Sequence, residues 1–299
     1  MAPTRRAAIW RMLKKIFLVI FILHTLWFVV FLFRQFYNPG FPIERLQTKV
    51  LLVLGFATAF GLLYYFWLRK IAIVNKVAVV LRETFFICYI TSFLYLLLGI
   101  IFNPPVTITQ LVSVVKGYGL KRDYVSYSEM SDNIKLAVIA SEDQLFPDHD
   151  GFDLKAIKKA IKYNARHTTR QRGASTLSQQ TAKNVFLWQG GGFFRKGLEV
   201  YFTFSIEKVW GKEKILERYL NVAEMGPGIF GVQAASRAYF NKDAKDLTRI
   251  EAAQIAACLP NPKKLTVKPL SGYVASRANA IAAQMNNIAG DPDVRELLR

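Results

Sequence analysis

The stretch IKLAVIASEDQL, residues 134–145, has the pattern of a buried α-helix that ends in acidic side chains. Ile134, Ala137, Val138 and Ser141 recur at intervals of three and four residues, which places them on one helix face. The same period predicts further helices over Asp153–Asn164, Thr176–Leu187, Phe194–Trp210, Lys212–Ala223, Val232–Tyr239, Thr248–Cys258 and Gly272–Ile288. No convincing alternating pattern of a strand appears. Residues 103–299 are therefore predicted to form one mostly helical domain.

Capping residues support these helix boundaries. Ser175 precedes one helix, and Thr248 stands three residues before Glu251, which is the spacing of a capping box. The segment Asn103-Pro104-Pro105 should end the helix before it, because neither proline can continue a helix. Val106–Val115 fits either a short strand or a helix beside the membrane.

Three apolar runs occupy the first third of the chain, at residues 16–33, 50–68 and 84–102. Each has about the 20 residues that a helix needs to cross the hydrocarbon core of a bilayer. Hydrophobic residues make up 52% of the 299-residue chain, which excludes a disordered or low-complexity protein. Residues 1–102 are therefore predicted to be a membrane anchor of three transmembrane helices, with His24 packed against a neighbouring helix.

The charges that flank these runs predict the orientation of the chain. Basic residues are more numerous at the amino terminus and in the second loop (Arg5, Arg6, Arg11, Lys14, Lys15; Arg69, Lys70, Lys76, Arg82) than in the first loop (Arg34, Arg45, Lys49). The amino terminus is therefore predicted to be cytoplasmic. Three crossings would then place residues 103–299 on the other side of the membrane.

The whole chain is basic, with 40 Lys and Arg against 21 Asp and Glu and a formal net charge of +19. Such an excess favours anionic partners: lipid head groups, phosphates or nucleic acid. Cys88 and Cys258 lie far apart in apolar sequence, so a disulfide framework is excluded. The three histidines lack the spacing of metal ligands, and no P-loop, dinucleotide fingerprint or nucleophile elbow is present.

Glu142 is the first candidate for proton transfer. It follows the apolar segment LAVIA and precedes Leu145 and Phe146, so burial should raise the pKa of its carboxyl toward the range useful for a general base. Asp143 beside it adds like-charge repulsion in the same direction. Taken alone, the segment also fits an acidic helix end with solvated side chains.

A second candidate segment is GASTLSQQTAKN, residues 173–184. Gly, Ser and Thr at a helix start expose backbone N–H groups that suit a phosphate. Gln179, Gln180 and Lys183 follow within two turns, and such a polar face would suit a sugar phosphate. Taken alone, the segment also fits a capped helix with a polar face. The basic loop Ala165–Gly173 before it fits either contact with anionic lipid or substrate, or simple exposure to solvent.

A third candidate is the cluster Arg195-Lys196-x-x-Glu199. Both cations are one helical turn from the carboxylate, where an exposed pair would be weak. In a buried site they would instead keep Glu199 ionised. Two carboxyl groups held in opposite protonation states are a recurrent arrangement for acid–base chemistry at sugars.

Taken in order, these segments resemble the peptidoglycan glycosyltransferase family, found as monofunctional biosynthetic transglycosylases and as the polymerase domain of class A penicillin-binding proteins. The resemblance covers about residues 103–288 and resides in five motifs: Glu142-Asp143-x-x-Phe146-x-x-His149-x-Gly151, Gly173-x-Ser175-Thr176-x-x-Gln179-Gln180 with Lys183-Asn184, Arg195-Lys196-x-x-Glu199, Lys214-Ile215-Leu216-Glu217-x-Tyr219-Leu220-Asn221 and Gly231-Val232-x-Ala234-Ala235-x-x-x-Tyr239-Phe240. No transpeptidase segment follows, so the chain resembles the monofunctional type.

The resemblance implies a lysozyme-like helical domain with a smaller, membrane-facing jaw. It also implies polymerisation of lipid II into glycan strands for the bacterial cell wall, at the outer, periplasmic face of the cytoplasmic membrane. The implied partners are lipid II, the growing glycan strand, anionic membrane lipids and other cell-wall synthases, with no nucleic acid.

The family's functional residues map onto this sequence position by position. Glu142 would be the general base, and Glu199 would support the transition state near the leaving pyrophosphate. The other implied residues are those that hold phosphates (Lys183, Arg195, Lys196), line the donor site (Ser175, Gln179, Gln180), brace the cleft (Glu217, Asn221) or shape it (Asp143, Phe146, His149, Gly151).

Two features depart from the family pattern. Many members have an arginine eight positions after the Lys183 equivalent, where this chain has Gly191; Arg170 or Arg172 could supply that contact. The monofunctional members also have one membrane helix, where three are predicted here.

Two alternative functions stay open at this point: a lytic transglycosylase or lysozyme-like hydrolase, and an inactive membrane scaffold of the cell-wall machinery. The sequence requires no cofactor, but it leaves open a divalent cation shared by Glu199 and the pyrophosphate.

Overall fold

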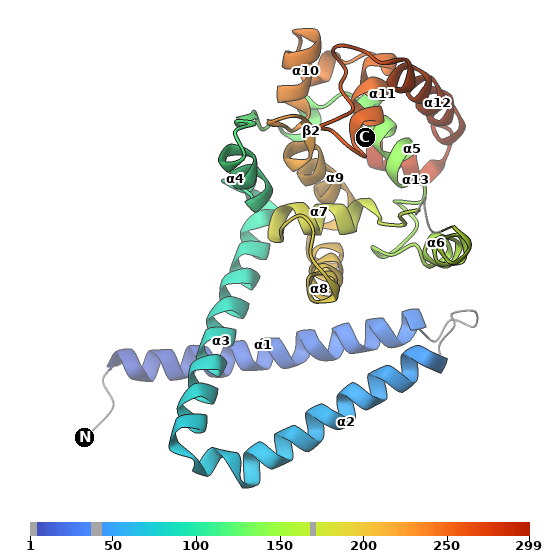
Figure 1. The fold of residues 1–299 in the computed structure, drawn as a ribbon. Helices are drawn as coiled ribbons and strands as arrows, with labels where there is room; N and C mark the ends of the chain where they lie inside the picture. Colours follow the sequence, from blue (N-terminus) through green and yellow to red (C-terminus); the bar gives the residue numbers. More distant parts are fainter. Residues whose placement is uncertain (1–4, 37–43, 168–171) are drawn as a thin grey trace. The chain divides into compact units, whose positions relative to one another are not determined.

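The structure is a computed structural model that describes residues 5–36, 44–167 and 172–299. The chain divides into two compact units, Met1–Tyr95 and Leu96–Arg299, and each is described here by itself. Figure 1 shows the course of the chain and labels its elements.

Long helices make up the first unit: α1 (Arg5–Phe36), α2 (Glu44–Phe66) and most of α3 (Ala72–Ile101), with a short 3-10 helix at Leu68–Lys70. Within this unit, the Phe21 ring of α1 packs edge-on against Phe85 and Tyr89 of α3, at centroid distances of 5.4 and 5.0 Å. The His24 Nδ1 atom lies 3.4 Å from the Tyr89 hydroxyl. His24 therefore lies against a neighbouring helix, as the sequence predicted.

Two of these helices, not three, are candidate membrane spans by length and composition within the described residues: Ile9–Leu32 and Ala72–Ile101. The run predicted at residues 50–68 lies on α2 and is not among them. Its helix ends at Phe66, so its uncharged helical part is residues 50–66, at the short end of what a crossing needs. Side chains 44–51, 53 and 54 of α2 lie outside the described residues. The sequence argument that three crossings place residues 103–299 on the far side of the membrane therefore loses its basis.

The second unit is mostly helical, as predicted. Its α-helices are α4 (Ile108–Val115), α5 (Asp132–Glu142), α6 (Leu154–Arg166), α7 (Leu177–Phe186), α8 (Phe193–Val209), α9 (Gly211–Val222), α10 (Val232–Phe240), α11 (Arg249–Cys258), α12 (Gly272–Ile288) and α13 (Pro292–Leu298), with 3-10 helices at Tyr127–Glu129 and Ala244–Asp246. The segment that fitted either a strand or a helix is the helix α4. The predicted helices all form, with ends shifted by a few residues.

A small three-stranded sheet differs from the expectation that no strand forms. The strands β1 (Lys121–Arg122), β2 (Glu224–Gly226) and β3 (Ile229–Phe230) lie in the order β1-β3-β2, with β1 parallel and β2 antiparallel to β3. Strands of two or three residues are too short to show an alternating pattern, so the sequence could not reveal them.

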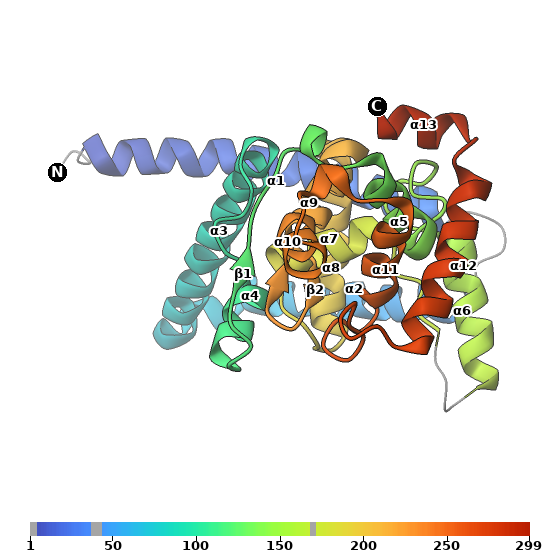
Figure 2. The same ribbon diagram turned by 90° about the horizontal axis from the view of Figure 1, so that it is seen from above.

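Two groups of helices form the core of this unit. Helices α5, α11 and α12 lie side by side, and α7 packs between α8 and α9 (Figures 1 and 2). Ile134 and Ile139 of α5 and Ala253 and Ala256 of α11 are fully buried. The small side chains of α11 let α5 approach closely. Just beyond the end of α5, Asp143 binds the first residue of α7, Leu177.

Candidate active site

Glu142 is the last residue of α5 and is bound by a side chain of α7. The Gln180 Nε2 group donates to Glu142 Oε2 at 2.9 Å, and the Tyr219 hydroxyl donates to Gln180 Oε1 at 3.3 Å. Burial is the main cause that raises the pKa of Glu142 above its ordinary value, and the charge of Asp143 acts in the same direction. The geometry therefore gives Glu142 the raised pKa that the sequence predicted.

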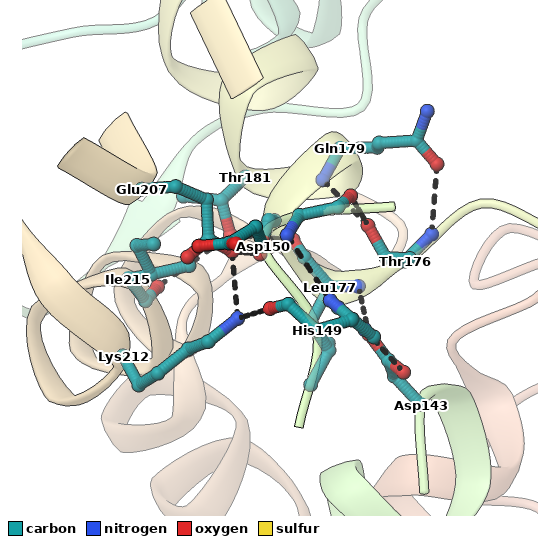
Figure 3. A network of polar contacts seen from close by, with 12 residues as sticks. Asp143, His149, Asp150, Thr176, Leu177, Gln179, Thr181, Glu207, Lys212 and Ile215 are labelled. Carbon is teal, nitrogen blue, oxygen red and sulfur yellow. Dashed lines mark hydrogen bonds and ion pairs between the residues drawn. The ribbon is translucent and has the colours of Figure 1, made fainter. Parts of the chain in front are cut away.

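Asp143, the next residue, connects the end of α5 to the start of α7 and to the turn that contains His149. Its Oδ2 atom accepts from the Leu177 amide of α7 at 2.9 Å, and both carboxylate oxygens lie 3.1 Å from His149 Nε2 (Figure 3). His149 Nδ1 accepts from the Gly151 amide at 3.1 Å, so Nε2 must carry the ring proton that binds Asp143. A buried carboxylate thus satisfies an amide at the start of α7 that has no partner within the helix.

Thr176, rather than the predicted Ser175, is the N-cap of α7. Thr176 and Gln179 form a capping box, in which each side chain accepts from the other residue's amide, and Ser175 is exposed (Figure 3). The Thr176 hydroxyl also donates to the carbonyl of Gly151 at 2.7 Å. Gly151 has a φ of +86°, and a Cβ atom there would lie 2.8 Å from Thr203 Cγ2, so this turn requires glycine. The predicted contacts of Ser175 and Gln179 with substrate stay predictions.

A second buried carboxylate, Glu207 of α8, was missed by the sequence analysis. Its Oε1 atom accepts from Ser178 of α7 and lies 2.8 Å from Lys212 Nζ, which also donates to the carbonyl of His149 (Figure 3). Lys212 lies over the ring of Phe146 at 4.7 Å. These partners come from separate helices, so no local pattern could have indicated them. Glu207 and Lys212 hold the starts of α7 and α9 against the 146–151 turn.

Glu199 of α8 is held by the two cations that the sequence placed beside it. Its side chain is 3% exposed, Arg195 Nη1 lies 2.5 Å from Oε2, and Lys196 pairs with Oε1. Arg195 Nε is buried without a hydrogen-bond partner among the described residues. Glu199 and Arg195 therefore form a largely buried ion pair beside the more exposed Lys196, and Arg195 still has a donor to offer.

Lys183 of α7 is influenced by the charges of both candidate carboxylates, Glu142 and Glu199. Burial is the main cause that lowers its pKa, and it is within the range of the charges of Glu199, Arg195, Lys196 and Glu142. Among the described residues, its ammonium group has no hydrogen bond or ion pair. Gln180 and Lys183 are three residues apart and share one face of α7. A half-buried cation of this kind can bind an anion without first giving up a protein partner.

Glu217 and Asn221 of α9 make contacts that brace the structure. Glu217 binds Lys214 Nζ and Arg218 Nη1, each at 2.7 Å. The Asn221 amide accepts from the Val125 N–H at 3.0 Å and donates to the Val125 carbonyl at 2.9 Å, so it holds an extended segment as a strand would. That these two residues brace the cleft stays a prediction.

The family model described as "Transglycosylase" matches residues 109–286, which include every residue of this site. The chain belongs to the transglycosylase family. Relatives named biosynthetic peptidoglycan transglycosylase include proteins from Pectobacterium carotovorum subsp. carotovorum (strain PC1), 47% identical over 77% of this chain and 93% of the relative, and from Escherichia coli (strain ATCC 8739), 52% identical over 60% of this chain and 74% of the relative. A relative with the same name from Shigella boydii serotype 4 (strain Sb227) is 52% identical over the same fractions. This transglycosylase is therefore a glycosyltransferase enzyme.

Within the described residues of this transglycosylase, no group of three or more His, Cys, Asp or Glu side chains could hold a metal ion. A cation at Glu199 would need oxygen ligands from the substrate. Whether one binds stays a prediction.

At Gly191, where the resemblance implies an arginine in many members, the backbone favours glycine. Its φ is +98°, and a Cβ atom there would lie 3.2 Å from both Cβ and Cδ of Arg195. Arg172, one proposed substitute for the missing arginine, stacks over the Tyr163 ring at 4.0 Å, and Arg170 lies outside the described residues.

Gly191→Arg is therefore expected to lower activity instead of restoring a phosphate contact. A side chain at this φ costs about 1–3 kcal/mol and would displace Arg195 from Glu199. Steady-state rates with lipid II as the substrate would measure the effect. A rate equal to or above that of the parent chain would contradict it.

Asp143→Asn is expected to destabilise the protein by about 1–3 kcal/mol, because the buried Leu177 amide and His149 both lose a charged acceptor. The measurement is thermal unfolding of the purified full chain in detergent. Asp148→Asn, an exposed change in the same turn, is the control. Equal melting temperatures for both variants would show that the Asp143 contacts contribute nothing.

Proposed function

We propose that this transglycosylase polymerises lipid II into peptidoglycan glycan strands. The 4-hydroxyl of the GlcNAc unit on the acceptor attacks C1 of the MurNAc unit on the donor, with inversion. The new O4–C1 bond forms as the bond from C1 to the diphosphate oxygen breaks. The electron pair leaves with undecaprenyl diphosphate, and the hydroxyl proton goes to Glu142.

The residues take roles that follow from their surroundings. Glu142, with its raised pKa, acts as the general base, and Gln180 orients it. Lys183, Arg195 and Lys196 stabilise the charge that develops on the diphosphate. Glu199 fixes the last two of these cations in place.

One observation carries this proposal above all. A desolvated carboxyl, on Glu142, lies within electrostatic range of a desolvated ammonium group, on Lys183, that has no partner among the described residues. A proton acceptor that feels the charge of a nearby anion site suits a sugar hydroxyl that attacks while a diphosphate leaves. The names of the relatives support the same substrate.

The proposal extends to the fold and to the membrane. We propose a lysozyme-like domain with a membrane-facing jaw, anchored in the cytoplasmic membrane of a bacterium, with α2 as a third crossing and the active site on the periplasmic side. Both substrates carry polyprenyl chains, so the site must face the lipid surface. Anionic lipids and other cell-wall synthases are the proposed partners.

A reporter enzyme that is active only in the periplasm, fused after Arg299, is expected to be active in cells, because three crossings place the carboxyl terminus outside. A fusion after Lys70, in the loop between α2 and α3, is expected to be inactive. The reverse pattern would contradict this topology.

The decisive experiment gives the purified full chain labelled lipid II in detergent and separates the products by size. Glycan polymer supports the proposal. Cleavage of preformed glycan without polymer would indicate a lytic enzyme, and the absence of both would indicate a scaffold.

A further inference from the structure

The last six residues of α3, Leu96–Ile101, belong to the second unit and are held there by a tryptophan. Trp210 stands between α8 and α9, and its Nε1 group donates to the Leu96 carbonyl at 2.8 Å. Gly99 lies against the same ring: a Cβ atom there would be 2.4 Å from Trp210 Cζ2. Any side chain at position 99 would push the indole out of its place.

Arg218 of α9 binds the end of the same helix. Its side chain is 1% exposed, and it donates to the Gly99 carbonyl at 3.0 Å and to Asn103 Oδ1 at 2.7 Å, while Glu217 pairs with it at 2.7 Å. The last carbonyls of a helix lack partners within the helix and carry partial negative charge. A buried arginine here satisfies them and binds the helix end with a charge.

Trp210 and Arg218 are also connected to the active site through neighbouring residues. Tyr219, next to Arg218, donates to Gln180, which in turn binds Glu142. The Trp210 ring lies 5.7 Å from the ring of Phe186, the last residue of α7. The end of α3 is thus two contacts from α7, through Trp210 and Phe186, and one further hydrogen bond joins α7 to the base on α5.

We propose that Trp210 and Arg218 form a clamp that fixes the end of the last membrane helix on helices α7–α9, and so sets the position of the active site relative to the lipid surface. They are positioning residues, because neither side chain binds Glu142 or Lys183. This inference rests on the proposed function. A substrate held in the bilayer by its polyprenyl chain presents its diphosphate at a fixed depth, so a misplaced site loses rate steeply.

The burial of Arg218 favours a positioning role in the clamp over a purely stabilising role. A buried ion pair contributes little net stability compared with apolar side chains of the same size, because desolvation offsets the attraction. What the guanidinium supplies is direction: several donors in one plane, matched to acceptors at a helix end. An apolar residue could fill the volume but could not bind the carbonyls of Leu96–Ile101, the end of α3.

The test compares Arg218→Met with Arg295→Met, a matched control in which an exposed arginine donates to the Ala289 carbonyl. Each full chain is assayed with long-chain lipid II in vesicles and with a short-chain lipid II in detergent. We expect Arg218→Met to lower the rate in vesicles by about tenfold or more, and the rate in detergent by less than about twofold. Arg295→Met should leave both rates unchanged.

Equal losses on both substrates would show a general structural role, and no loss on either would show no role; both results overturn the clamp. Trp210→Phe keeps an aromatic side chain but removes the Nε1 donor and part of the ring area, so it repeats the test if Arg218→Met folds poorly. We expect it to show the same preference for the short-chain substrate, with a smaller loss in vesicles.

A second measurement does not depend on activity. A nitroxide at Phe102→Cys, in a Cys88→Ser background, reports motion at the end of α3, where Phe102 is 62% exposed. We expect a restricted spectrum in the parent and a mobile one with Arg218→Met, and an unchanged spectrum would overturn the clamp. If the parent fails to polymerise either substrate, the proposed function fails while this spectrum still decides the clamp.

Discussion

Glu142→Gln is expected to reduce glycan polymerisation by at least about 100-fold, because a glutamine cannot accept the proton of the attacking hydroxyl. The replacement keeps the size of the side chain and an oxygen that can accept from Gln180. The rate of polymer formation from labelled lipid II is the measurement. Glu213→Gln, an exposed change on α9, is the matched control and should retain full activity.

The same variant should not lose stability. Burial raises the pKa of Glu142, so the folded state favours the protonated form and ionisation costs stability. This cost is absent at acid pH and appears as the pH rises through the raised pKa. At neutral pH, Glu142→Gln should therefore melt at the same temperature as the parent or above it, with a difference that shrinks toward pH 4. Retained turnover, or a large loss of stability, would contradict the role of Glu142 as the base.

Lys183→Met is expected to lower kcat/KM by about 100- to 1,000-fold, the usual effect of removing a group that stabilises developing negative charge. The ammonium group has no hydrogen bond or ion pair in the described part of the chain, so its loss should disturb the fold little. Lys264→Met, at an exposed position, serves as the control. A loss confined to KM, with an unchanged kcat, would show ground-state binding alone.

The pH dependence should have two limbs with separate origins. Activity should rise with pH as Glu142 ionises, and this limb is shifted upward because burial raises the pKa of Glu142. Activity should fall at alkaline pH as Lys183 loses its proton, and this limb is shifted downward because burial lowers the pKa of Lys183. Lys183→Arg, which keeps its charge, should move the alkaline limb to higher pH. An unmoved alkaline limb would assign it to another group.

Local patterns were enough to predict most of the helices and the pairing of Glu199 with Arg195 and Lys196, because these depend on spacing within one helix. The apolar segment before Glu142 likewise predicted a raised pKa. The prediction of Ser175 as the N-cap of α7 was wrong by one residue. Ser175 and Thr176 are both good caps, and only Thr176 binds the Gly151 carbonyl.

What the sequence could not predict depends on contacts between distant elements. Glu207 gave no signal, because Ser178 and Lys212 reach it from α7 and from the start of α9. The strands were too short for any period. Two of the three predicted membrane spans are candidates within the described residues; part of α2 lies outside them, so its crossing stays a prediction.

The hydrogen bonds of Gln180 affect the direction from which a substrate can approach Glu142. Burial raises the pKa of Tyr219 well above its ordinary value, so its hydroxyl keeps its proton and holds Gln180 Oε1 as an acceptor. The amide nitrogen must then face Glu142 and occupy Oε2. Among the described residues, Oε1 of that carboxylate has no hydrogen-bond partner, so it is the oxygen more open to the proton of an incoming sugar hydroxyl. The direction from which the acceptor hydroxyl reaches its base would thus depend in part on a phenol one residue beyond Arg218, while inversion at C1 sets the configuration of the new bond.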